Sequence, residues 1–238
     1  MCIRDSVYTY GGFNGGEWDG TNNVSGVLTV IDVPQSFDLI ISEVTDPTNF
    51  DGRFVEIYNP TGSDVNFGLD TWYLAKQSNG GSWTDVELTG TIPAGGTYVV
   101  GTSNFNATYG FDPDLISGIP NGNGDDGYFL YGGGDQTTGT LVDAYGVIDL
   151  DGTGEPWEYE DAIAVRNADI TAPRTDWLET EWTITAGNST IATPGVHPNP
   201  VPSEPVISDI SAYPGTPTSS DMVDIFANIT DNLSLIHI

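Results

Sequence analysis

The chain has very few of the residues on which thiol, zinc and histidine chemistry depend. Its 238 residues include one cysteine and two histidines. One cysteine excludes a framework of internal disulfides, and a zinc site needs several Cys or His ligands. A Ser-His-Asp arrangement would have to use His197, which sits in a proline-rich segment and is poorly placed to be held against a nucleophile. The sequence therefore predicts no catalytic residues.

Basic residues are almost as scarce. Five Lys and Arg stand against 34 Asp and Glu, which gives a formal net charge of −29. Nucleic-acid binders need Lys and Arg to neutralise phosphates, and an anionic membrane surface repels such a chain. Neither nucleic-acid binding nor membrane insertion is expected of this sequence. A strongly acidic chain of this kind is typical of proteins that stay soluble outside the cell, so we expect an extracellular or cell-surface protein.

The two ends of the sequence resemble translated sequencing adapter. The DNA strings that encode Met1–Ser6 and Leu233–Ile238 are reverse complements of each other, and such tails are set aside in the same way as expression scars. We therefore expect an internal, metagenomic piece of a longer protein in which neither Cys2 nor His237 is native. The net charge is unchanged, because the tails contain one basic and one acidic residue, Arg4 and Asp5.

Short β-rich runs, separated by turn residues, fill the middle of the chain. The sequence has 30 Gly and 15 Pro, and no stretch shows sustained helical periodicity. Many short strands, each bounded by turn residues, predict an all-β fold, either an antiparallel sandwich or a barrel. The runs with the composition and length of strands are Leu39–Val44, Phe54–Tyr58, Thr71–Ala75, Thr97–Val100, Tyr128–Tyr131, Leu141–Tyr145 and Ala162–Val165.

Composition also indicates several parts along the chain. Residues 37–196 are expected to form the sandwich, and residues 197–205, which hold four prolines, a stiff extended linker. Residues 206–232 read as the truncated start of a second immunoglobulin-like domain. Two interpretations are open for residues 7–36, which include a strand-like run at Val27–Ile31. They form either the end of a preceding β domain or an extra edge strand of the central sandwich.

Four motifs of the central domain follow one another in a characteristic order. They are Leu39–Val44, Phe54–Thr61, Val65–Leu74 and Ile92–Val100. In order and spacing they resemble the lamin tail domain family, an immunoglobulin-like β-sandwich of nuclear lamins and of secreted bacterial proteins. The resemblance runs from Phe37 to about Val196, and its later half is similar to the longer bacterial versions. No heptad-repeat rod is present, so a nuclear filament role is not expected.

The resemblance implies a non-catalytic accessory role, because the bacterial versions recur beside secreted nucleases, phosphatases and surface proteins. We expect the domain to space or dock neighbouring modules of the same chain, with protein or glycan at the cell surface as further partners. Three residues are assigned structural roles. Glu56 should accept hydrogen bonds from the backbone of a loop rather than contact a ligand, Asn59 should bond its own turn, and Trp72 should anchor the core rather than serve as a ligand platform.

The acidic loop Asp149–Asp161 is a candidate calcium site, since hard cations require six to eight oxygen ligands. The candidate ligands are Asp149, Asp151, Glu155 and either Glu158 or Asp161. The loop does not follow the EF-hand pattern, and a solvated acidic loop is the alternative. Calcium is the only cofactor that the sequence suggests, and bound to the native state it would raise thermal stability.

Two further functions compete with the accessory role. Trp83 and Trp157 are placed on loops, where they would either stack on sugars, as in a carbohydrate-binding module, or cover the open ends of the sandwich. Paired carboxylates such as Asp149 and Glu155 would suit an acid/base glycoside hydrolase. Acidic residues are so abundant in this chain that this last signal has little specificity.

Overall fold

The computed structural model describes residues 10–11, 23–24, 38–197, 206–213 and 224–230. Backbone contacts divide the chain into two units, one of Phe37–Ser203 and one that combines Met1–Ser36 with Glu204–Ile238. The adapter-like ends, the run at Val27–Ile31 and residues 198–205 of the expected linker lie outside the described residues.

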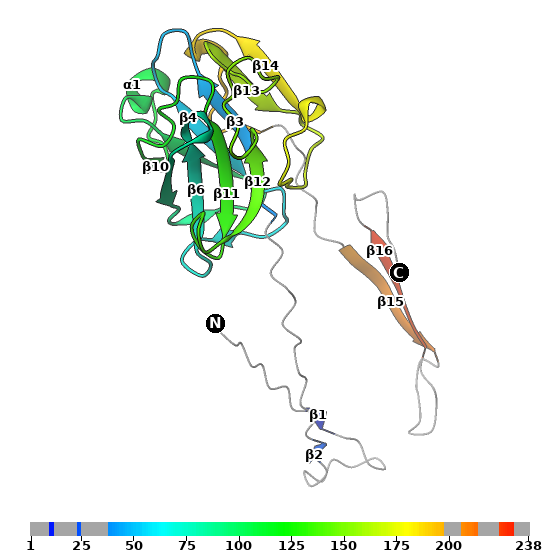
Figure 1. Cartoon of the computed structure of the whole chain (residues 1–238). Helices are drawn as coiled ribbons and strands as arrows, with labels where there is room; N and C mark the ends of the chain where they lie inside the picture. The colour runs from blue at the N-terminus through cyan, green and yellow to red at the C-terminus, as the bar shows by residue number, and fades with distance from the viewer. Residues whose placement is uncertain (1–9, 12–22, 25–37, 198–205, 214–223, 231–238) are drawn as a thin grey trace. The chain divides into compact units, whose positions relative to one another are not determined.

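Two facing sheets form the unit Phe37–Ser203 (Figure 1). The first has the strand order β10 (Leu115–Ile116), β9 (Thr97–Gly101), β4 (Phe54–Tyr58), β3 (Ile40–Asp46), β13 (Ala162–Arg166) and β14 (Trp182–Ala186). The second has the order β12 (Thr140–Tyr145), β11 (Gly127–Gly132), β6 (Trp72–Gln77) and β7 (Trp83–Glu87). Neighbouring strands are antiparallel except β10 and β9, which run parallel. The predicted antiparallel sandwich is confirmed.

All seven runs predicted as strands lie largely within β3, β4, β6, β9, β11, β12 and β13. The sequence did not identify β5 (Val65–Asn66), β8 (Thr91–Ile92), β10, β7 and β14, nor the single helical turn α1 (Phe105–Tyr109). Most of these elements are too short to show an alternating pattern. Three 3₁₀ turns complete the unit: η1 (Ser78–Gly80), η2 (Glu179–Glu181) and η3 (Ser189–Ile191).

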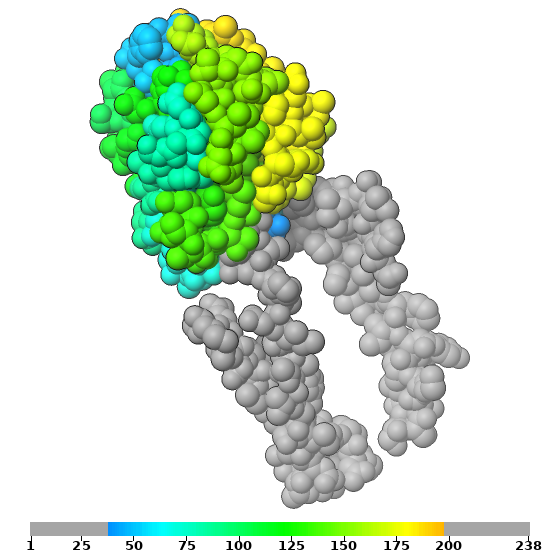
Figure 2. Space-filling view, in the orientation of Figure 1, coloured from blue at the N-terminus to red at the C-terminus, as the bar shows by residue number. Residues whose placement is uncertain are grey.

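The core lies between the two sheets and follows the alternation of the strands. In β4, Val55 and Ile57 face this core, whereas Phe54 packs on the other side of the sheet. Trp72 of β6 is 2% exposed within the core, as predicted for an anchor. Figure 2 shows the same unit from outside, where the green surface of β11 and β12 adjoins the cyan surface that β6 contributes.

The outer face of the six-stranded sheet is covered as well. Phe54 and Val99 on this face pack against Phe105 of α1, and Ala192 adds to the same cluster. As a result β3 and β4 are buried along their whole length. Polar side chains that point outward from these two strands are therefore shielded from water, and each needs a hydrogen-bond partner within the protein.

The remaining described strands form three separate antiparallel pairs, one of which joins β5 and β8. β1 (Tyr10–Gly11) pairs with β2 (Asn23–Val24), and β15 (Val206–Tyr213) pairs with β16 (Asp224–Thr230). The β15–β16 register shifts between Ser208 and Ser211. None of the helices in the described ranges has the length and apolar character needed to cross a membrane.

Candidate functional site

Two glutamates lie side by side on the covered face of the six-stranded sheet. Glu43 of β3 is paired directly with Glu56 of β4, and they are 1% and 0% exposed. The register shifts between Ile41 and Glu43, so β3 contains a bulge with Ser42 as the extra residue. Because of this bulge, Ile41 and Val44 both face the core while Glu43 points outward beside Glu56. We call Glu43 and Glu56 the carboxylate pair.

The carboxylate pair holds the segment Thr193–His197, which we call the exit segment because the proline-rich residues follow it. Thr193 donates from its backbone N–H to both Glu43 oxygens at 3.0 and 3.3 Å, and from its hydroxyl at 2.8 Å. The Gly195 N–H donates to Glu56 Oε2 at 2.7 Å. The predicted role of Glu56, accepting hydrogen bonds from a loop backbone, is confirmed.

Burial changes the protonation of the carboxylate pair. It raises the pKa of Glu43 to about 7, although the Thr193 donors oppose this shift. It raises the pKa of Glu56 to about 8, where the Ser42 hydroxyl (2.7 Å from Oε1) lowers the value and the charge of Glu43 raises it further. Neither glutamate forms an ion pair with any residue in the described ranges. Glu56 is therefore mostly protonated at pH 7.

His197 ends the exit segment and is buried at 9% exposure, with its ring 4.5 Å from that of Tyr58 in β4. Burial, together with the charge of Arg166, lowers the pKa of His197 to about 4. The imidazole is therefore neutral at physiological pH. The residue that the sequence offered as the sole histidine base is thus packed on the sheet rather than placed in an open site.

A second buried group of charges joins the two sheets at one edge. Arg166 of β13 donates to Asp143 Oδ2 of β12 and to Glu181 Oε2, both at 2.6 Å. Arg166 and Asp143 are 1% and 0% exposed. Although burial opposes it, the two carboxylates raise the pKa of Arg166, so it stays charged. We call Arg166, Asp143 and Glu181 the arginine network.

The arginine network also fixes the backbone. Asp143 accepts from the Ile41 N–H of β3 at 2.7 Å and from the Arg174 N–H at 2.6 Å. The hydrogen bond from Ile41 connects β12, an edge strand of the four-stranded sheet, to β3 inside the six-stranded sheet. Ile41 is the residue just before the bulge in β3. The guanidinium of Arg166 additionally lies 5.3 Å from the Trp182 ring centre. These contacts fix one edge of the sandwich.

Comparison with known proteins agrees with this architecture. The family model described as Lamin Tail Domain matches residues 33–150. This part of the chain is a lamin tail domain. No curated protein matches the chain. The matched residues contain Glu43, Glu56 and Asp143, whereas the exit segment and Arg166 follow the end of the match.

Asn59 has the structural role that the sequence predicted for it, which is to bond its own turn. Its Oδ1 accepts from the Thr61 N–H at 3.0 Å, which closes the turn after β4. Its Nδ2 donates to the carbonyl oxygens of Ser63 and Pro93 at 2.8 and 3.0 Å. One buried amide therefore satisfies backbone groups from two separate loops.

The predicted calcium ligands are not gathered into a cluster. In residues 38–197 and the other described ranges, no three His, Cys, Asp or Glu side chains are placed to hold a metal ion. Asp149 bonds Gln77, Asp151 bonds Thr153 of its own loop, and Glu158 accepts from the Gly154 N–H. The Glu155 carboxylate accepts no hydrogen bond from another described residue. Calcium binding by this lamin tail domain stays a prediction.

The two tryptophans proposed as sugar platforms do not lie on exposed loops. Trp157 is 1% exposed in the main core, so its assignment as a ligand platform is wrong. Glycines allow this burial, because a Cβ at Gly152 would come within 2.6 Å of the indole. Trp83 is the first residue of β7 and packs against Phe129 with ring centres 5.2 Å apart. Its expected position on a loop is also wrong, and it is only partly buried.

Sequence reasoning missed Glu43, the arginine network and the exit segment. Alternation counted from Ile41 puts Glu43 on the core side, and only the bulge turns it outward. One signal was available for Arg166, because in a chain with five basic residues a lone arginine at the end of an apolar run needs an acidic partner. Which of the 34 acids would pair with it could not be read from the sequence.

Proposed function

We propose that this lamin tail domain is a non-catalytic spacing and docking module of a larger secreted or cell-surface bacterial protein. The observation that carries this proposal is the exit segment, which two buried glutamates hold against the middle of the sandwich. A spacer has to define where the chain leaves its surface, and three hydrogen bonds from Thr193 together with the one from Gly195 do this. Neighbouring modules of the same chain are the expected partners.

The chemistry of the chain supports a non-enzymatic, extracellular role. The lamin tail domain is a non-enzymatic domain type, and here the fully buried carboxyl groups of Asp143 and Glu56 accept hydrogen bonds from backbone N–H groups. A net charge of −29 suits solubility outside the cell and disfavours nucleic acid as a partner. Surface protein or glycan remains a further partner in this proposal.

The spacing role is tested by the position of the exit segment in solution. Spin labels at Leu69 and Val196, which are 71% and 63% exposed, report the distance between the sandwich and this segment once Cys2 is replaced by serine. Double electron–electron resonance should give one narrow distance distribution. In the Glu43→Ala/Glu56→Ala variant, Thr193 and Gly195 lose their acceptors, so the distribution should broaden.

The matched control removes two carboxylates from the exposed loop instead, in the variant Asp151→Ala/Glu158→Ala, and should leave the narrow distribution intact. A broad distribution in the unsubstituted chain would show that the exit segment is not held, and the spacing role would fail.

The absence of catalytic activity that we propose is tested with chromogenic glycosides and phosphoesters, for which no turnover is expected. Turnover that disappears in Asp149→Asn/Glu155→Gln would support the hydrolase instead.

A further inference from the structure

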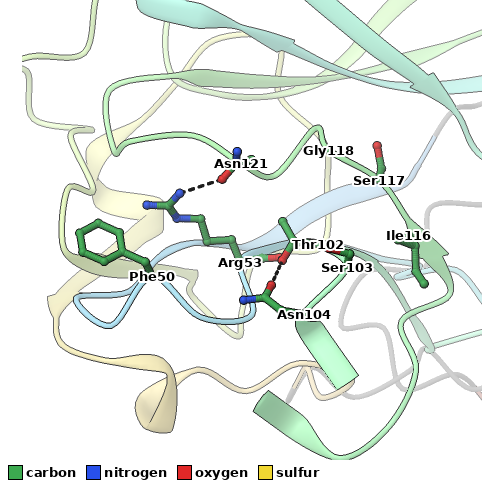
Figure 3. Close-up of a pocket in the computed structure, with 9 residues that line it drawn as sticks. All are labelled: Phe50, Arg53, Thr102, Ser103, Asn104, Ile116, Ser117, Gly118 and Asn121. Carbon is green, nitrogen blue, oxygen red and sulfur yellow. Dashed lines mark hydrogen bonds between the residues drawn. The ribbon is translucent and has the colours of Figure 1, made fainter. Parts of the chain in front are cut away.

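An open pocket of about 400 Å³ lies at one end of the sandwich, and Figure 3 shows the residues that line it. Three chain segments form it: the β3–β4 loop, the residues that follow β9, and the residues that follow β10. Phe50 and Arg53 come from the first segment, Ser103 and Asn104 from the second, and Asn121 from the third. Its volume is within the range of pockets that bind small molecules.

Phe50 is held in a strained and exposed position on this pocket. Its φ angle is 56°, in the left-handed region that bulky residues avoid, and its side chain is 64% exposed. The loop persists in this form because its base is anchored: Thr48 donates to the Gly187 carbonyl at 3.0 Å, and Asn49 bonds Ser189 twice. Strain that the surrounding structure maintains is characteristic of ligand-binding positions.

Arg53 supplies a rigid support for the ring but no free positive charge. Its guanidinium lies 5.2 Å from the centre of the Phe50 ring. The same group pairs with Asp46 at 2.5 Å and donates to Asn121 Oδ1 at 2.9 Å. With its cation neutralised, in a chain of net charge −29, the pocket does not favour an anionic ligand.

The other side of the pocket offers unused polar groups. The Ser103 hydroxyl and the Asn121 Nδ2 have no hydrogen-bond partner among the described residues, and Asn104 Nδ2 reaches only Asp51 at 3.4 Å. Ile116, 61% exposed, adds an apolar rim. An aromatic face together with neutral hydroxyl and amide groups matches a ring that has one apolar face and several hydroxyls.

We propose that this pocket binds a neutral saccharide, with a sugar ring on the face of Phe50 and its hydroxyls bonded by Ser103 and Asn121. The site differs from the one that the sequence suggested, because Trp157 is buried and Trp83 belongs to another part of the fold. The proposal is independent of the spacing role, since neither Glu43, Glu56 nor the exit segment lines the pocket.

The full chain is tested against an array of neutral oligosaccharides built from glucose, xylose, mannose or N-acetylglucosamine, with polygalacturonate and heparin as acidic arms. Hits are then titrated by calorimetry. The key variant is Phe50→Gly, because glycine accepts a positive φ and the fold should be kept or slightly stabilised. The dissociation constant should rise at least about tenfold in Phe50→Gly, a loss of roughly 1.4 kcal/mol.

Ser103→Ala should weaken binding by a smaller factor, and the matched control Leu69→Gly, which removes an exposed apolar side chain elsewhere, should leave it unchanged. The proposal is overturned if no neutral oligosaccharide binds, if Phe50→Gly binds as well as the unsubstituted chain, or if the acidic polymers bind more tightly than the neutral ones. Loss of binding in Trp83→Ala but not in Phe50→Gly would also overturn it, by moving the site to β7.

Discussion

The carboxylate pair and the arginine network bury acidic groups within one small domain, yet they stabilise them in opposite ways. In the network, Asp143 and Glu181 are compensated by the charge of Arg166 at 2.6 Å. In the pair, Glu43 and Glu56 face each other without a cation and receive hydrogen bonds only from hydroxyl and backbone donors. In the first arrangement the guanidinium stays charged, although burial raises the pKa of Asp143 beside it, whereas in the second burial raises the pKa of both glutamates and favours their protonated forms.

This difference shows how an acidic chain with five basic residues uses the few cations it has. Arg166 is placed where the two sheets meet, beside two buried carboxylates that would be costly to bury without a cation. The exit segment needs acceptors for its N–H groups, and these can be supplied by carboxyl groups whether or not they are ionised. Arg166 keeps its charge near neutral pH, whereas the carboxylate pair is expected to change its protonation there.

The largest expected effect comes from removing the cation. In Arg166→Met, Asp143 and Glu181 lose their compensating charge, and the free energy of unfolding should fall by about 3–5 kcal/mol. Urea denaturation followed by tryptophan fluorescence measures this loss. Arg174→Met is the control, because the Arg174 side chain is 36% exposed and lies 3.7 Å from Glu181, so its loss should cost under about 1 kcal/mol. Equal losses in the two variants would contradict the special role of Arg166.

The next effect is a pH dependence that arises from the carboxylate pair. The pKa values of Glu43 and Glu56 are raised to about 7 and 8, so their contribution to stability is complete below the ordinary value of 4.5 and is lost as the pH rises through 7 and 8. The free energy of unfolding should therefore decrease between pH 6.5 and pH 9, by about 2–4 kcal/mol. Urea melts at each pH measure it.

Glu43→Gln/Glu56→Gln provides the control for this pH dependence. Glutamine stays neutral over the whole range, so the slope between pH 6.5 and pH 9 should flatten in the variant. A flat profile in the unsubstituted chain, or an unchanged slope in the variant, would show that the two buried arrangements do not differ as described.

A smaller effect is expected from a single hydroxyl on the exit segment. Thr193→Val removes the donor 2.8 Å from Glu43 and should cost about 1 kcal/mol. Because this hydrogen bond lowers the pKa of Glu43, its loss should also move the decline in stability to higher pH. Thr190→Val is the matched control, since the Thr190 hydroxyl bonds exposed Asn188. If Thr193→Val lowers the free energy of unfolding no more than Thr190→Val does, the hydrogen bond from the Thr193 hydroxyl to Glu43 does not stabilise the domain.

The smallest expected effect concerns carboxylates that are exposed rather than buried. Asp151 and Glu158 are already bonded within their own loop, so millimolar calcium compared with excess chelator should shift the melting temperature by under about 2 °C. A calcium-dependent rise of several degrees, lost in Asp149→Asn/Asp151→Asn, would instead support the sequence-based prediction that this loop rearranges around the ion.

The sequence was informative where the chemistry is local. Asn59 satisfies its own turn two residues ahead, so its role followed from the Asn-Pro-Thr-Gly pattern. Trp72 was recognised as a core anchor because it lies in an apolar strand. Trp157 was misplaced because it lies in an acidic, glycine-containing loop that has the composition of an exposed segment. Its burial depends on contacts with Gly146 and Gly152 in the folded loop.

By itself the sequence determined the sandwich, since alternating apolar residues and frequent turn residues leave a chain of this composition few other ways to bury its strands. Only the tertiary structure decided which acids are buried and what holds them. Glu43 meets Thr193 across 150 residues and Asp143 meets Ile41 across 102, and a one-residue bulge selects the face on which Glu43 lies. Such contacts depend on register and chain closure, which residue pattern alone does not encode.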